Sequence, residues 1–222
     1  MDNWQKPRVK ICCISSIEEA ELAIKYGASA LGLVSEMPSG PGVISDEEIY
    51  KIVQIVPPPI ATFLLTSETN SKEIIEHYRK AQTTAIQIVD ELTERDYHEI
   101  RRALPNVKIV QVVHVVDEKS VDEAIELAES IDAILLDSGN PNLKIKELGG
   151  TGRRHDWKLS RKIVEAVEKP VFLAGGLNYK NVREAIETVQ PFGLDLCSGV
   201  RTDGKLDLIK LEKFFAEVEK TS

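Results

Sequence analysis

Short apolar segments alternate with amphipathic segments along the whole chain. Residues 8–14 (RVKICCI) form a nearly continuous apolar run, which is typical of a buried strand. In the next segment, residues 17–28, Ile17, Ala20 and Ile24 recur at helical spacing. The first 28 residues therefore predict a strand followed by a helix.

This pairing repeats eight times without a break in composition. The predicted strands cover residues 8–14, 30–35, 60–66, 85–90, 107–115, 133–138, 170–176 and 193–200. The predicted helices cover residues 17–28, 45–56, 71–81, 93–104, 118–130, 156–168, 178–189 and 206–220. Apolar strands that alternate with helices are typical of a parallel sheet covered by helices. Eight such units in 222 residues predict an α/β fold, a single (β/α)8 TIM barrel domain over residues 1–222. An open, doubly wound sheet is the structural alternative.

Composition narrows the class of protein. The formal net charge is −8 and no block of Lys or Arg occurs, which argues against a nucleic-acid partner or an anionic membrane surface. The polar start of the chain, residues 1–8, gives no sign of a secretory signal. No apolar run approaches the ~18 residues that span a bilayer. The three cysteines, an odd number, do not predict a disulfide framework, and a reduced cytoplasmic location is expected.

Two reactive side chains stand at predicted strand ends, where barrels of this class carry their active sites. Cys12 closes the first strand and Asp137 the sixth. A thiol whose pKa is lowered can act as a base, and a buried carboxyl can stay protonated and act as an acid. A small sugar between them would undergo proton transfer at two atoms. The alternative for Cys12 is a small core residue. No metal site is predicted, because adjacent cysteines cannot easily share one ion.

Glycine-rich loops follow the last two strands. The seventh strand ends in Gly175 and Gly176, and the eighth is followed by Ser198 and Gly199. Small residues let backbone N–H groups approach an anion, and loops after the last two strands of a barrel often bind phosphate. The sequence thus predicts a phosphate site, although Gly175-Gly176 alone could be a tight turn.

The loop after the sixth strand is long, from about Ser138 to His155, and contains glycines. Gly150, Thr151 and Gly152 could fold over a ligand, whereas a plain surface loop is the alternative. The basic residues beside it, Arg153 and Arg154, and also Arg201 after the eighth strand, are possible charge partners of a substrate.

The two adjacent cysteines are expected to point in opposite directions, because side chains alternate along a strand. Cys12 would share a face with Lys10 and Ile14 and look into the barrel mouth. Cys13 would look toward the helices or begin the loop. We therefore do not expect the two to act as a pair.

The chain resembles the phosphoribosylanthranilate isomerase family. The resembling segments lie in the same order along the chain and cover residues 9–12, 27–34, 135–138, 149–157, 171–186 and 193–200. The resemblance implies the Amadori rearrangement of N-(5′-phosphoribosyl)anthranilate in tryptophan biosynthesis, with Cys12 as base and Asp137 as acid. It implies a small phosphorylated sugar as substrate and no cofactor. We expect a monomer or a homodimer.

Several positions depart from the family pattern. Cys13 stands where the family has glycine, and Arg201 stands where it has an acid. Residues 35–45 lack the arginine that meets the anthranilate carboxylate in the family, and residues 85–91 lack its histidine. Three hypotheses therefore stay open at this point. The protein is an isomerase of phosphoribosylanthranilate, a diverged member acting on another phosphorylated sugar or amine, or a barrel that binds a phosphate ligand without catalysis.

Overall fold

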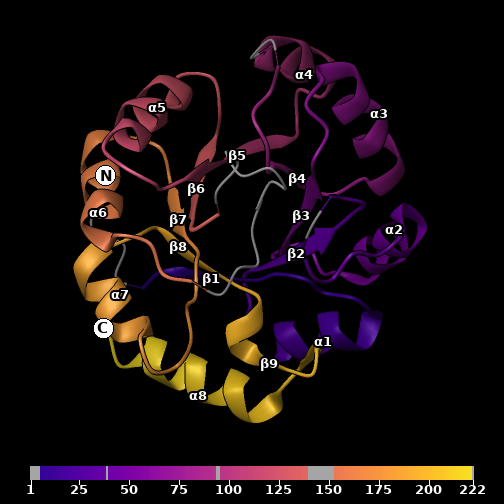
Figure 1. The fold of residues 1–222 in the computed structure, drawn as a ribbon. Helices are drawn as coiled ribbons and strands as arrows, with labels where there is room; N and C mark the ends of the chain where they lie inside the picture. Colours follow the sequence, from indigo (N-terminus) through magenta and orange to yellow (C-terminus); the bar gives the residue numbers. More distant parts are fainter. Residues whose placement is uncertain (1–5, 39, 94–95, 140–152, 222) are drawn as a thin grey trace.

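A closed barrel of eight parallel strands forms the centre of the computed structural model (Figure 1). The model describes residues 6–221 except 39, 94–95 and 140–152. The strands are β1 (Arg8–Ile11), β2 (Ala30–Val34), β3 (Ala61–Thr66), β4 (Ala85–Ile88), β5 (Lys108–His114), β6 (Ala133–Asp137), β7 (Val171–Leu173) and β8 (Gly193–Leu196). Each strand pairs with its sequence neighbours, and β8 pairs with β1 to close the barrel. The (β/α)8 prediction is confirmed, and the open sheet is excluded.

In the described part of the chain, eight α-helices surround the barrel (Figure 1). They are α1 (Ile17–Lys25), α2 (Asp46–Ile55), α3 (Ser71–Ala81), α4 (Tyr97–Ala103), α5 (Lys119–Ala128), α6 (Trp157–Ala166), α7 (Val182–Val189) and α8 (Leu208–Glu219). Side-chain oxygens cap most of their N-termini; Ser45, for example, accepts a hydrogen bond from the Glu48 N–H at the start of α2. Such caps fix where each helix begins relative to the preceding strand end.

The apolar side chains form two separate cores. The larger core lies between strands and helices and includes Ile11, Leu64 and Phe214. The smaller core fills the barrel interior, where the Phe172 ring packs edge-on against Phe63. Strands buried on both faces explain the continuous apolar runs in the sequence. The interior core also supports the floor of the cavity described below.

The strands are shorter than the sequence pattern predicts, and the chain after β8 adds elements that it does not predict. β1 ends at Ile11 because Cys13 adopts a left-handed backbone with φ of 62°. After β8 come a 3-10 turn, η1 (Ser198–Val200), and a hairpin of β9 (Arg201–Thr202) and β10 (Lys205–Leu206). This hairpin places Arg201 against the end of β1.

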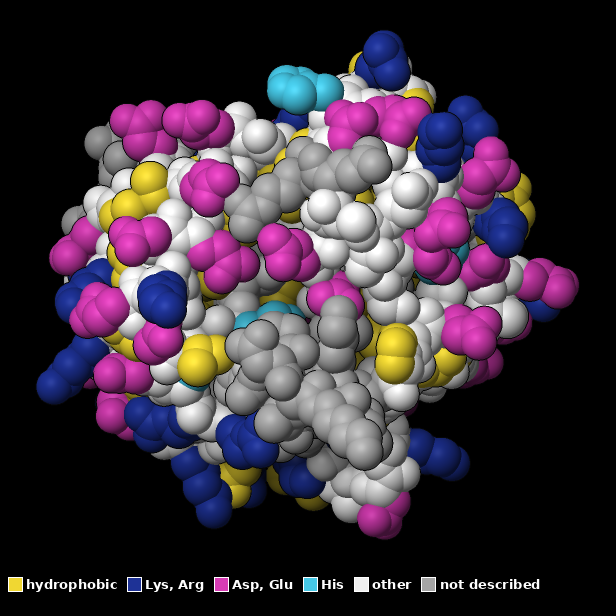
Figure 2. Space-filling model, turned by 45° about the horizontal axis from the view of Figure 1, so that its top comes forward, with side chains coloured by type: hydrophobic (Ala, Val, Ile, Leu, Met, Phe, Trp, Pro, Cys, Tyr) yellow, Lys and Arg dark blue, Asp and Glu magenta, His cyan; other side chains and the backbone are white. Residues whose placement is uncertain are grey.

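Acidic side chains cover much of the face shown in Figure 2, whereas basic ones gather mainly toward its edges. This distribution agrees with the net charge of −8. None of the helices in the described part of the chain is long and apolar enough to cross a membrane.

Candidate active site

One cavity at the C-terminal ends of the strands is lined by six of the nine predicted site residues that the structure describes. Its volume is about 720 Å³, counting the space that is open to solvent. The lining includes the predicted acid–base pair and the predicted phosphate loops: Cys12, Asp137, Gly175, Gly176, Ser198 and Gly199. The structure therefore brings together residues that lie up to 187 positions apart in the sequence, from Cys12 to Gly199.

Cys12 lies just beyond β1 and is held by the backbone of the neighbouring strand. Its N–H donates to the Leu196 carbonyl of β8 over 2.7 Å, so the β1–β8 pairing continues through this residue. Burial raises the pKa of the Cys12 thiol to about 11, against the effect of Lys10, which lowers it. The thiol is therefore protonated at neutral pH when the cavity is empty, and a base at this position needs a group that stabilises the thiolate.

An ion pair between Lys10 and Asp195 lies below Cys12, and the sequence pattern predicted no role for it. The Nζ of Lys10 donates to Oδ1 of Asp195 over 2.8 Å, and both side chains are buried. The register of β1 and β8 places the two residues side by side. The sequence does contain a sign of this pair, which is a charged residue inside each of two apolar strands. A buried charge is costly without a partner, so each of these residues is expected to have one.

Asp137 ends β6 and carries a carboxyl group suited to donate a proton. Burial raises its pKa, although the Ser138 N–H, which donates to its Oδ1 over 2.7 Å, opposes that effect. The neighbouring residue on β5 is His114, whose ring also lowers the pKa of Asp137. A carboxyl whose pKa is raised by burial is the usual form of a general acid.

The two glycine loops have backbones that other residues would not fit. Gly175 and Gly176 have φ of 82° and 65°, in the left-handed region. The side-chain amides of Asn178 and Asn181 donate to the Gly176 carbonyl over 3.1 Å and 3.0 Å and hold this turn. A Cβ on Gly199 would overlap the Leu177 carbonyl oxygen, so the loops after β7 and β8 touch. The loops around Gly175-Gly176 and Ser198-Gly199 therefore form one continuous rim of the cavity, in which the two backbones are in contact.

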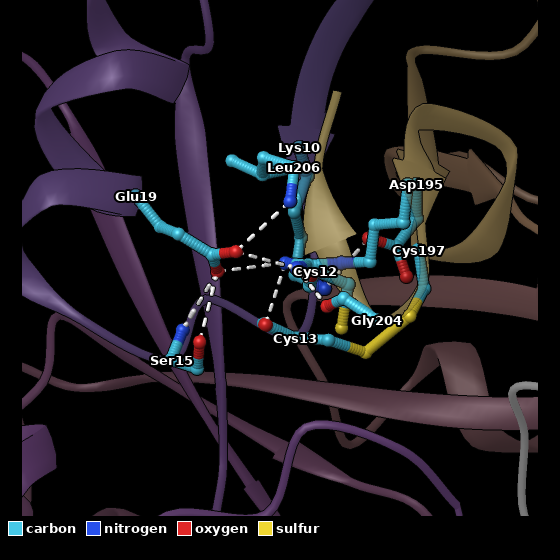
Figure 3. The surroundings of a disulfide bond; sticks show 10 residues. Lys10, Cys12, Cys13, Ser15, Glu19, Asp195, Cys197, Gly204 and Leu206 are labelled. Atoms are coloured by element: carbon cyan, nitrogen blue, oxygen red, sulfur yellow. Dashed lines mark hydrogen bonds and ion pairs between the residues drawn. A yellow bond between two sulfur atoms is a disulfide. The ribbon is translucent and has the colours of Figure 1, made fainter. Parts of the chain in front are cut away.

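A disulfide joins Cys13 to Cys197 at the edge of the cavity (Figure 3). The expectation that the cysteines do not form a disulfide is therefore wrong. It failed because the barrel brings the ends of β1 and β8 together, 184 residues apart in sequence. Cys13 begins the loop after β1, which is one of the two alternatives expected for it, and it lines the cavity together with Cys12. Strand alternation ends before Cys13, whose φ is positive.

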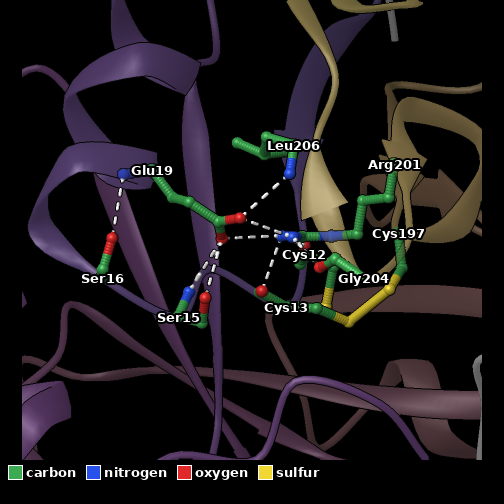
Figure 4. Close-up of polar contacts among 9 residues, drawn as sticks. All are labelled: Cys12, Cys13, Ser15, Ser16, Glu19, Cys197, Arg201, Gly204 and Leu206. Atoms are coloured by element: carbon green, nitrogen blue, oxygen red, sulfur yellow. Dashed lines mark hydrogen bonds and ion pairs between the residues drawn. A yellow bond between two sulfur atoms is a disulfide. The ribbon is translucent and has the colours of Figure 1, made fainter.

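Arg201 supports the backbone beneath the cavity. Its guanidinium donates to the carbonyls of Cys12 and Cys13 over 3.2 Å and 2.6 Å (Figure 4). It also pairs with the carboxylate of Glu19 at 2.8 Å, and Glu19 in turn accepts from the Leu206 N–H. Arg201 does not line the cavity, and these contacts occupy it. The prediction that it is a charge partner of the substrate does not fit this arrangement.

The other predicted positions do not line the cavity, or they lie outside the described residues. Arg154 stacks over the Trp157 ring at 3.6 Å and pairs with Glu184 at 3.4 Å. Arg153 is exposed and is not part of the lining. The lid prediction falls on Gly150, Thr151 and Gly152, which lie outside the described residues.

The half of the cavity opposite the glycine loops is apolar. The side chains that share this half are those of Val34, Met37, Leu65, Val89, Val112 and Leu135. Gln87 adds an amide whose oxygen is buried without a hydrogen-bond partner. No Lys, Arg or His side chain lines the cavity among the residues that the structure describes. An apolar ring fits this half of the cavity.

Comparisons with known proteins agree with this geometry. The family model of N-(5′-phosphoribosyl)anthranilate (PRA) isomerase matches residues 9–217. The chain is 36% identical to the N-(5′-phosphoribosyl)anthranilate isomerase of Methanosarcina acetivorans, over 97% of this chain and 94% of the relative. A solved phosphoribosyl anthranilate isomerase in complex with reduced 1-(o-carboxyphenylamino)-1-deoxyribulose 5-phosphate superposes with a TM-score of 0.76 at 26% identity, over 96% of this chain and 99% of the other. The monomers made from the dimeric isomerase of Thermotoga maritima superpose with a TM-score of 0.77 at 26% identity, over 96% and 99%.

Proposed function

The chain belongs to the N-(5′-phosphoribosyl)anthranilate isomerase family, and from this premise we propose that it catalyses the Amadori rearrangement of N-(5′-phosphoribosyl)anthranilate. The product is 1-(2-carboxyphenylamino)-1-deoxyribulose 5-phosphate, an intermediate of tryptophan biosynthesis. The observation that carries the proposal is a single cavity that holds Cys12, Asp137 and both glycine loops. A barrel that binds phosphate without chemistry would need neither side chain, so their presence in the cavity supports catalysis.

Asp137 is the general acid in this scheme. Its carboxyl donates a proton to the furanose ring oxygen, the bond from C1′ to that oxygen breaks, and a protonated imine forms at C1′. The pKa of Asp137 is raised by burial, so the proton is held until the substrate arrives. The Ser138 N–H then stabilises the carboxylate that remains.

Cys12 is the general base. As a thiolate it takes the proton from C2′, and the electron pair moves to neutralise the imine and gives an enolamine. The enolamine gains a proton at C1′ and loses its hydroxyl proton, which yields the ketone. Acid and base stand on β6 and after β1, on different sides of the cavity, and so reach different atoms of one sugar.

The phosphate group is bound by backbone N–H groups of the rim around Gly175, Gly176, Ser198 and Gly199. Gly175 and Gly176 have positive φ, and their backbone makes a turn of the kind found in anion-binding loops. Gly150, Thr151 and Gly152 remain predicted ligand contacts from the sequence. The phosphorylated sugar would then span the cavity from the rim to the acid–base pair.

The test is turnover of phosphoribosylanthranilate by the purified protein and by Cys12→Ala and Asp137→Asn. We expect each substitution to lower kcat by about 100-fold or more, since a positioned general acid or base contributes that much. Asp90→Asn is a matched control, because Asp90 is a buried carboxylate beyond the end of β4 that does not line the cavity. Full activity in both site variants would refute the assigned roles.

The apolar half of the cavity favours a second candidate. Its described lining holds no cationic side chain for a carboxylate, whereas it accommodates an uncharged ring. We therefore also propose a phosphoribosyl amine with an uncharged aromatic group as substrate. Comparing kcat/KM for phosphoribosylanthranilate and for N-phosphoribosyl aniline decides between the two. A preference of about tenfold or more for the carboxylate-bearing substrate would exclude this candidate.

A cytoplasmic location and a monomeric or homodimeric state stay predictions. The dimeric relative of Thermotoga maritima supports a dimer as one of the two states. Light scattering of the purified protein separates them.

A further inference from the structure

A lysine lies fully buried below Cys12, inside the barrel. The exposed fraction of Lys10 is 0%, and its Nζ lies 2.8 Å from the Asp195 carboxylate and 5.3 Å from the centroid of the Phe63 ring. Burial by itself lowers the pKa of Lys10, but the charges of Asp195 and Cys12 outweigh it and raise the pKa. The ammonium therefore stays charged in the interior, where an unpaired charge would be expensive.

Lys10 also lies close to the sulfur of Cys12. The ends of the two side chains meet over Gly32 of β2. A Cβ at Gly32 would lie 2.7 Å from the Cys12 Sγ and 2.8 Å from the Lys10 Nζ. The missing side chain thus makes the room in which ammonium and thiol come together.

The chemistry of Cys12 requires such a neighbour, because only the thiolate takes a proton. Of the charged groups around Cys12, Lys10 favours the thiolate, and Asp195 opposes it. The Arg201 guanidinium contacts the Cys12 carbonyl rather than the sulfur and is paired with Glu19. Asp137 faces the same cavity from β6. Lys10 is therefore the cation that bears directly on the thiol.

We propose that Lys10 is a positioning residue that stabilises the thiolate of Cys12, and that Asp195 holds Lys10 in place. Cys12 releases its S–H proton to solvent, and the resulting thiolate pairs with the Lys10 ammonium before it takes the C2′ proton. The inference rests on the role of Cys12 in the proposed function, but it concerns the acidity of the thiol and can be measured without substrate.

The experiment follows alkylation of the thiol by iodoacetamide as a function of pH. The chain has three cysteines, and the disulfide of the oxidised protein protects two of them, so the signal reports Cys12 alone. The double variant Lys10→Met/Asp195→Asn removes the pair together, which avoids leaving one charge buried alone. We expect the midpoint of its profile to move to higher pH and the rate at pH 9 to fall about tenfold or more, since one pKa unit is tenfold in thiolate.

A pair with a merely structural role would leave the midpoint of the double variant unchanged. With substrate, the double variant should lower kcat while KM changes less than about threefold, because Lys10 does not line the cavity and Asn keeps the shape of Asp195, which does.

Lys108→Met is the control, since Lys108 is an exposed lysine on β5 that pairs with Asp132. It should leave the profile unchanged, whereas Lys10→Arg, which keeps the charge, should restore part of the wild-type profile. An unchanged midpoint in a folded double variant, as judged by circular dichroism, overturns the inference. If the profile shifts as expected but the wild type does not turn over phosphoribosylanthranilate, the proposed function fails and the inference stands.

Discussion

The disulfide between Cys13 and Cys197 should carry a large share of the stability of the oxidised barrel. It closes a loop with a sequence separation of 184, which spans nearly the whole barrel. In the chain-entropy model, a loop of this length lowers the entropy of the unfolded chain by an amount worth about 5 kcal/mol at 25 °C. Measured disulfides typically contribute about 2–4 kcal/mol, so we expect a loss in that range when the bond is opened.

Two perturbations open the bond, reduction by dithiothreitol and the substitution Cys197→Ser. With a urea dependence of about 2 kcal/mol per molar, a loss of about 2–4 kcal/mol lowers the midpoint of urea unfolding by about 1–2 M. Unfolding followed by circular dichroism with and without reductant measures this shift. Cys12→Ser is the control, because Cys12 is the free cysteine and its loss leaves the disulfide closed.

The variant Cys13→Gly distinguishes the contribution of the disulfide to stability from that of the strained backbone at Cys13. Cys13 has a φ of 62°, a left-handed conformation that is unfavourable by about 1–2 kcal/mol for a residue with a Cβ. Glycine relieves this strain, although it adds freedom to the unfolded chain. The variant should therefore lose less stability than Cys197→Ser does. Coincident urea curves for the oxidised and reduced wild type would refute the reasoning about the closed loop.

Three further predictions concern single residues. Burial by itself raises the pKa of Glu19, but the contacts with Arg201 outweigh it and lower the pKa. The stability that this pair provides should therefore be lost as pH falls below about 4.5. Thermal melts of Glu19→Gln should be less sensitive to pH in that range than those of the wild type. Burial raises the pKa of Asp137, so its ionisation destabilises the folded state as pH rises. In urea titrations, the stability of Asp137→Asn relative to the wild type should therefore grow between pH 3 and pH 8. A constant difference would contradict this. In Gly199→Ala the new Cβ would overlap the Leu177 carbonyl oxygen and displace the rim, so we expect KM to rise about tenfold or more, with calorimetric titration of inorganic phosphate as a second readout.

The order of the eight βα units could be predicted because strand and helix leave different hydrophobic periods in the sequence. The cavity could be located for a related reason, since a barrel gathers its strand ends on one side. Cys12, Asp137 and the residues of both glycine loops lie at or just after strand ends, and all line the cavity. Such positions depend on local pattern and topology alone.

Pairings between distant strands could not be predicted from local pattern. The partner of Lys10 on β8 depends on the register of the closing strands, and the partner of Cys13 depends on where β1 stops. The role of Arg201 was missed because the β9–β10 hairpin turns it toward Glu19, and a two-residue strand has no recognisable period. In each case the chemistry follows from the closure of the barrel.

Closure by the disulfide also changes how the protein would respond to a pulling force. The chain between Cys13 and Cys197 is a covalent ring, and the bond crosses the seam where the first strand meets the last. A force applied to the two ends of the chain passes through the disulfide, so it can extend only the segments before Cys13 and after Cys197. In the reduced protein the same force acts on the β1–β8 hydrogen bonds and opens the barrel from its seam. The mechanical unit of the oxidised protein is therefore the ring.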